Sequence, residues 1–117
     1  MTRGGNCENT VGAPIRDLIQ FLRTKNANVV VLSGHLNFNH GAVAEEIRAV
    51  VEKVAEDLNT TESPVITVHH YRGWREKPDE IYSDTFDWAH PNIKGQEKMA
   101  VNWLNAMQPW LDSFQER

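Results

Sequence analysis

The sequence has little of what disulfide-stapled, membrane-spanning or nucleic-acid-binding proteins depend on. It contains one cysteine in 117 residues, which excludes an internal disulfide. Its 16 acidic and 12 basic side chains give a formal net charge of −4, which argues against a partner held by phosphate contacts. No stretch approaches the roughly 20 apolar residues that cross a bilayer, and the first residues lack the apolar core of a signal peptide. We therefore expect a cytoplasmic protein, or one expressed without its leader, with no nucleic-acid or membrane partner.

The composition that is present is typical of a folded domain. Hydrophobic residues make up 40% of the chain and charged residues 24%, in the range of ordinary globular proteins. No internal repeat, low-complexity tract or Pro/Gly-rich linker divides the sequence. We therefore predict a single domain over residues 1–117.

Hydrophobic periodicity predicts alternating helices and strands. Apolar residues at helical spacing follow Pro14, which suits a first helical turn, and they predict a helix of about a dozen residues ending at Asn26 and Asn28. Runs of β-branched residues predict two strands that are buried on both faces. The first covers residues 29–32 and is ended by Gly34, and the second covers residues 65–68.

The remaining segments predict two more helices and a loop. An amphipathic stripe predicts a helix over residues 42–58, and a second stripe follows Pro91 and extends to Leu111. Residues 71–89 show no clean period, so we predict a long loop, and such loops are often functional. This order of elements implies an α/β fold, a three-layer αβα arrangement with short parallel strands.

Two buried strands leave both outer edges of a sheet without backbone partners. We therefore predict that the fold is completed by dimerisation or by exchange of elements between two copies, which makes the expected partner a second copy of the chain.

Polar residues that follow parallel strands are the first candidates for function, because ligands of such sheets bind beyond the carboxyl ends of the strands. The candidates are Ser33, His35, His69, His70, Asp87 and His90. The spacing of Asp87 and His90 lets a carboxylate orient an imidazole that moves protons. A helix cap beside a surface histidine is the alternative explanation of this spacing.

The segment from Asp84 to Ala100, DTFDWAHPNIKGQEKMA, resembles the last block of the SGNH (GDSL-like) hydrolases. The resemblance implies that His90 is the general base and that Asp87 is its partner. The order of elements upstream is similar to the second half of the carbohydrate-esterase-like members, so the likeness covers nearly all of the chain. It implies that residues 1–117 correspond to the C-terminal half of such a hydrolase.

The G-D-S block that carries the nucleophilic serine of that family is absent. Gly4-Gly5-Asn6-Cys7 resembles its G-x-N-D block, which implies an oxyanion-hole role for Asn6. Ser33 is an alternative nucleophile only if it reaches His90, and Cys7 only if the N-terminal segment folds over the site. Cys7 is otherwise explained as a small buried thiol.

Histidines offer another source of nucleophile. His35, His69 and His70 are candidate ligands for a divalent metal such as zinc, which would activate a water without any serine. Neighbouring strand residues point to opposite faces, so the alternative is that at most one of His69 and His70 is available. His40 is expected to be a solvated neighbour of the following helix.

Four tryptophans complete the candidates. Trp74 and Trp88 could wall a pocket for an acyl or aromatic group, with packing as the alternative for each. Trp103 and Trp110 lie seven residues apart on the last helix and are expected to be core residues.

The sequence thus predicts a hydrolase of ester or phosphoester bonds that uses His90, Asp87 and an activated water, with metal dependence left open. The alternative is a truncated, catalytically inactive homologue that serves as a binding or assembly module.

Overall fold

The computed structural model describes residues 4–35, 37 and 39–115. Its elements, in chain order, are α1 (Gly4–Cys7), the π-helix η1 (Glu8–Gly12), α2 (Ala13–Lys25), β1 (Val31–Gly34), α3 (Ala44–Leu58), β2 (Val65–Val68) and α4 (Ile93–Gln115). The chain therefore has the predicted α/β character. None of the described helices is both long enough and apolar enough to cross a membrane.

The two strands pair in parallel, with Val31 opposite Val65 and Gly34 opposite Val68. β1 begins two residues later than predicted, because the ladder starts only where Val31 meets Val65. The expectation that both strands are buried on both faces is wrong for β1, whose Val31, Leu32 and Ser33 are half-buried, and it holds only in part for β2, in which Ile66 and Thr67 are half-buried. Within the described residues the sheet has these two strands only, so no further strand covers the outer edge of β1.

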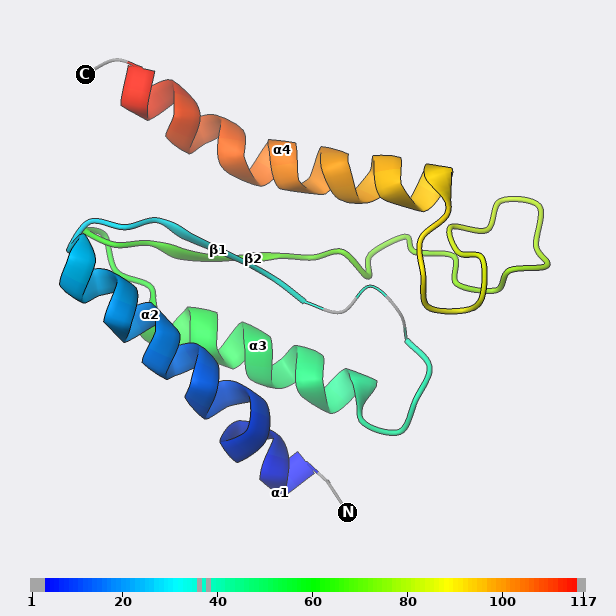
Figure 1. The fold of residues 1–117 in the computed structure, drawn as a ribbon, viewed down its shortest axis with the longest axis horizontal. Helices are drawn as coiled ribbons and strands as arrows, with labels where there is room; N and C mark the ends of the chain where they lie inside the picture. Colours follow the sequence, from blue (N-terminus) through cyan, green and yellow to red (C-terminus); the bar gives the residue numbers. More distant parts are fainter. Residues whose placement is uncertain (1–3, 36, 38, 116–117) are drawn as a thin grey trace.

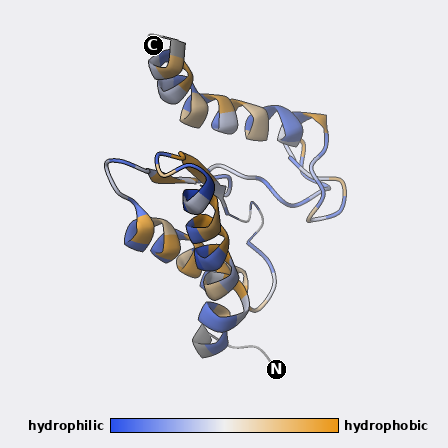
Figure 2. Cartoon of the chain, turned by 60° about the vertical axis from the view of Figure 1, so that its left-hand side comes forward, coloured by the Kyte–Doolittle hydropathy of each residue, from blue (hydrophilic) through white to orange (hydrophobic). Residues whose placement is uncertain are grey.

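The main core lies between the sheet and the helices on one of its sides. Ile19 of α2, Val54 and Ala55 of α3 and Val65 of β2 form its buried centre. Figure 1 shows α2 and α3 on this side of the strands and α4 on the other. Figure 2 shows hydrophobic residues gathered on the strands and alternating with hydrophilic ones along the helices.

Helix α4 packs less completely. Its Trp103 lies against Gly34, where an added Cβ would come within 2.9 Å of the indole ring. Trp103 and Trp110 are half-buried rather than fully enclosed in a core. Large apolar side chains remain exposed along the same helix: Val101, Leu104, Met107, Leu111 and Phe114.

The N-terminal segment is helical, which the sequence patterns did not predict. η1 leads directly into α2, whose Pro14 occupies the first turn as expected. Arg16 of α2 pairs with Glu8 of η1 at 3.0 Å and with Asp57 of α3 at 3.0 Å. This arginine therefore joins the N-terminal helical segment to both helices of the main core.

Helix α3 begins at Ala44, two residues after the predicted start. Gly41 has a φ of +96°, a left-handed conformation that glycine adopts without steric cost, and it turns the chain into the helix.

Candidate functional site

The loop before α4 brings Asp87 and His90 together. Asp87 Oδ2 and His90 Nδ1 lie 2.7 Å apart, and the side chains are 53% and 79% exposed. Backbone contacts hold together the two ends of the turn that contains them. The N–H of Phe86 donates to the carbonyl of His90, and Thr85 forms a bridge with Pro91. Asp87 therefore favours the ring tautomer with its proton on Nδ1, which leaves Nε2 as the basic nitrogen.

The carboxylate of Asp87 is held in place by backbone donors. Its Oδ1 accepts the N–H groups of His90 at 2.8 Å and Ala89 at 3.2 Å. The backbone bond from His90, then its ring, then the bond from Ala89 lower the pKa of Asp87 to about 2. Asp87 is therefore ionised at neutral pH and suited to stabilise a protonated imidazole.

Trp88, between the two residues, has a φ of +78°. A non-glycine residue in this region is strained, and such strain clusters at functional sites. Its N–H donates to Thr85 Oγ1 at 3.0 Å, which helps to hold the turn. The indole is 41% exposed and its edge meets the His40 ring, with centroids 5.9 Å apart.

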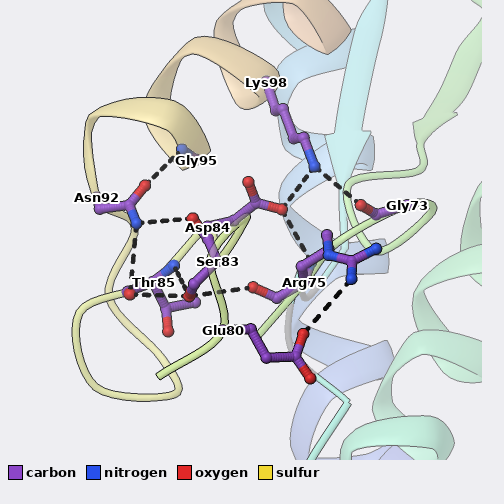
Figure 3. Close-up of polar contacts among 9 residues, drawn as sticks. All are labelled: Gly73, Arg75, Glu80, Ser83, Asp84, Thr85, Asn92, Gly95 and Lys98. Carbon is purple, nitrogen blue, oxygen red and sulfur yellow. Dashed lines mark hydrogen bonds and ion pairs between the residues drawn. The ribbon is translucent and has the colours of Figure 1, made fainter. Parts of the chain in front are cut away.

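A buried carboxylate anchors this loop to α4 (Figure 3). Asp84 has no exposed side-chain surface, and its Oδ2 accepts Lys98 Nζ at 2.7 Å and the N–H of Arg75 at 2.8 Å. Its Oδ1 is buried and has no partner among the described residues. Lys98 also donates to the carbonyl of Gly73, so one lysine of α4 holds two parts of the preceding loop.

Asn92 and Gly95 fix the start of α4 against the same loop (Figure 3). Asn92 Nδ2 donates to the carbonyl of Ser83 at 2.9 Å, while its Oδ1 accepts the N–H of Gly95 at 2.9 Å as a helix cap. A Cβ at Gly95 would clash with the carbonyl oxygen of Asp84 and with the Trp74 ring. Glycine at this position therefore permits the close approach of helix and loop.

A second polar cluster lies at the carboxyl ends of the strands. His35 Nε2 is 3.0 Å from His69 Nδ1 and 3.3 Å from Glu52 Oε2. One ligand atom from each residue lies within 4.8 Å of the others, so this group could hold a metal ion. Burial lowers the pKa of His35, and the charge of His69 lowers it further, which favours the neutral ring that binds metals.

His70 is not part of this cluster. Its Nδ1 faces the side-chain amide of Asn102 at 3.3 Å and its ring packs on Trp103, both on α4. Burial lowers the pKa of His70, and its Nε2 has no partner in the described part of the chain. His69 and His70 follow the end of β2 and make contacts with different elements, so the structure separates His70 from His35 and His69.

Side-chain contacts connect the two clusters without merging them. The ring of Tyr71 packs on His35 and under the guanidinium of Arg48. Arg48 donates to Asn39, whose backbone N–H donates to Glu76, and Glu76 contacts His40 at 3.2 Å. Within residues 4–35, 37 and 39–115, no hydrogen bond or ion pair joins Asp87 or His90 to the other cluster.

His40 keeps a side chain that is 40% exposed, as expected of a solvated residue, and it also has a partner that the sequence did not predict. It is half-buried and contacts Glu76. Burial opposes the ionisation of Glu76, but the N–H of Asn39 and the His40 ring outweigh it and lower the pKa of this carboxyl.

No protein-family model, curated protein or solved structure matches this chain.

The structure does not bring the other predicted residues to the dyad formed by Asp87 and His90. Asn6 lies in α1, where its carbonyl accepts Thr10 Oγ1, and α1 packs against η1 and α3. Cys7 is fully buried with its Sγ 3.9 Å from Glu46, as expected of a buried thiol. Ser33 is half-buried in β1, and no described hydrogen bond joins it to His90.

Trp74 and Trp88 have different environments. Trp74 is half-buried against Gly95, and its Nε1 is buried with no partner among the described residues. Trp88 is exposed beside the dyad. Trp88 is therefore the one of the two that a bound molecule could meet directly.

Sequence reasoning missed Glu52 and the anchoring role of Asp84. A helical period marks Glu52 only as a polar residue of the helix predicted over residues 42–58, and the tertiary fold places it beside His35. Asp84 is the first residue of the segment that resembles the SGNH hydrolases, and this position could have marked it as a candidate for a structural role.

Proposed function

We propose that this chain is related to the C-terminal half of the SGNH hydrolases and hydrolyses ester or phosphoester bonds at Asp87 and His90. The contact of 2.7 Å between Asp87 Oδ2 and His90 Nδ1 carries the proposal. It is supported by the two backbone donors on Asp87 and by the exposure of His90, which leaves room for a substrate.

In the proposed reaction, His90 Nε2 removes a proton from a water molecule as the water oxygen attacks the carbonyl carbon or the phosphorus atom. Asp87 stabilises the resulting imidazolium through Nδ1. His90 then returns the proton to the departing alcohol oxygen as the ester bond breaks. The products are an acid and an alcohol, and His90 is neutral again.

Trp88 is the proposed wall for the acyl or aromatic part of the substrate. It is exposed, adjacent in sequence to Asp87 and held in a fixed turn. Trp74 supports the site from inside through its contact at the start of α4. This mechanism assigns no step to Asn6, which lies in α1, a segment that packs against η1 and α3.

A divalent metal such as zinc is a second source of activated water. Metal coordination lowers the pKa of water toward about 7, so it needs no histidine base. The His35, Glu52 and His69 group supports this part of the proposal. Chelation separates the two sources, since it removes metal-dependent hydrolysis and leaves hydrolysis by His90.

The direct test measures hydrolysis of p-nitrophenyl acetate and bis-p-nitrophenyl phosphate by the full chain, before and after chelation. We expect His90→Ala to lower kcat/KM by about 100-fold or more. Glu97→Ala, an exposed change on the first turns of α4, is the matched control. Equal activity of the wild type and His90→Ala would remove the dyad from the mechanism.

The second candidate function is an assembly module, and the exposed apolar surface favours it. A shallow hollow of about 150 Å³ lies between the β1 segment and the C-terminal half of α4, and it is lined by Val30, Leu32, Met107, Trp110, Leu111 and Phe114. A second copy packing here would cover the hollow and complete the proposed three-layer arrangement as a homodimer.

Sedimentation of the full chain tests this assembly. We expect a dimer in the wild type and a monomer in Met107→Glu, because a charge in the hollow opposes its burial. Glu97→Gln on the same helix serves as the control. A wild-type monomer at all concentrations would exclude the homodimer.

A further inference from the structure

The cluster of His35, Glu52 and His69 combines residues from three elements that are distant in sequence. His35 follows β1, His69 follows β2, and Glu52 lies on α3. The side chain of His35 has no exposed surface, while that of Glu52 is 42% exposed. The cluster is therefore closed on one side and accessible on the other.

We propose that His35 Nε2, His69 Nδ1 and Glu52 Oε2 bind one zinc ion in a centre separate from the Asp87–His90 dyad. This inference rests on the metal-binding part of the proposed function and is independent of hydrolysis by the dyad.

Two of the three distances between the ligand atoms suit a small ion, and all three atoms lie within 4.8 Å of one another. Zinc bonds of about 2.0–2.1 Å in a tetrahedron place neighbouring ligand atoms about 3.3–3.4 Å apart. The distance from His35 Nε2 to Glu52 Oε2 is 3.3 Å, and that from His35 Nε2 to His69 Nδ1 is 3.0 Å. A small outward movement of one ring therefore admits the ion and replaces the contact between the two histidines.

The donor set favours zinc over magnesium or calcium. Two imidazole nitrogens and one carboxylate match a zinc centre, whereas magnesium and calcium prefer oxygen ligands. Catalytic zinc centres keep three protein ligands and leave the fourth position to water. Three residues are present here, which predicts an open position.

The cluster borders open space on the surface. Glu52 lines two neighbouring hollows, one of about 360 Å³ that His69 also lines and one of about 410 Å³ that Arg48 and Tyr71 line. A water or a small ligand can therefore approach the ion from the exposed side of the cluster.

A missing hydrogen bond to one of the ligand histidines limits the expected affinity for zinc. A metal-binding histidine usually donates its second ring nitrogen to a partner, and loss of that partner weakens binding by about 10–100-fold. Nδ1 of His35 is buried with no partner among the described residues. We therefore expect a weaker site than a fully supported zinc centre.

The test is a calorimetric titration with Zn²⁺ of the full chain after treatment with a chelator. We expect one zinc per chain and an affinity at least about 10-fold lower in Glu52→Gln. Glu56→Gln is the matched control, because Glu56 makes the same charge change one turn along α3 and borders the same hollow. Equal zinc affinity in the two variants, or no zinc binding by the wild type, would overturn the assignment.

Cobalt provides a second readout that does not depend on stability or activity. Co²⁺ in this centre should show the visible absorption of a four-coordinate ion, and His69→Gln should lose it. A six-coordinate spectrum in the wild type would contradict the proposed geometry.

His90→Ala distinguishes failure of this inference from failure of the hydrolase proposal. We expect this variant to lose hydrolysis by the dyad and to bind zinc as the wild type does. Zinc binding lost together with hydrolysis in His90→Ala would show that the centre and the dyad are one site.

Discussion

The Asp87–His90 dyad and the His35–Glu52–His69 cluster are built in opposite ways. The dyad joins residues three apart on an exposed loop, whereas the two histidines of the cluster are 34 residues apart. The cluster takes its position from the sheet and α3, and the dyad takes its position from local turns and from contacts with α4. The dyad should therefore respond to changes in its loop, and the cluster to changes in how the strands pack.

The largest effect is expected from Asp84→Ala, which removes the anchor of the dyad loop. Lys98 and the N–H of Arg75 lose a fully buried acceptor, and we expect a loss of about 3 kcal/mol in unfolding free energy. Urea unfolding measures this loss, with exposed Asp79→Ala as the control. Unchanged unfolding in both variants would show that the loop does not depend on this anchor.

Asp84→Ala also tests whether the dyad and the His35–Glu52–His69 cluster are independent of each other. We expect Asp84→Ala to reduce hydrolysis under conditions where it is still folded and to leave zinc binding unchanged. A parallel loss of both properties would mean that the two regions are not independent.

Asp87→Asn should lower kcat/KM by about 100-fold, with only the small loss of stability that an exposed carboxylate contributes. The amide keeps the shape of the side chain but cannot stabilise the imidazolium. Hydrolysis assays measure the rate, and thermal melting checks the fold. Asp79→Asn is the matched control, and equal rates in the two variants would contradict the role of Asp87.

The smallest effect is expected in acid. The folded-state pKa of Asp87 is about 2, below its ordinary value of 3.8, so its contribution to stability is present above pH 3.8 and is lost as the pH falls toward 2. Melting temperatures between pH 2 and 5 should fall more steeply in the wild type than in Asp87→Asn. Identical slopes would show that the hydrogen bonds to Asp87 do not persist in solution.

Local patterns were sufficient to predict most of the elements and the dyad. The strand at Val65–Val68, the helix start at Pro14 and the contact of Asp87 with His90 all depend on residues close in sequence. Hydrophobic period and short spacing therefore carry the necessary information.

Long-range contacts account for what the sequence did not predict. Glu52 joins His35 because α3 crosses back over the sheet, and a helical period marks Glu52 only as a polar residue. The contact of His40 with Glu76 likewise depends on the path of the long loop. The helical N-terminal segment relies on Arg16, whose two carboxylate partners come from different elements.

The left-handed backbone at Trp88 has a consequence for how this protein can be altered. Glycine would occupy that conformation without the cost of about 1–2 kcal/mol that a side chain incurs there. Selection for thermal stability alone would therefore favour Trp88→Gly. That variant would be more stable but would lose the indole ring beside His90. Under the proposed function, stability and substrate preference make opposite demands on this position, which makes it a starting point for redesign.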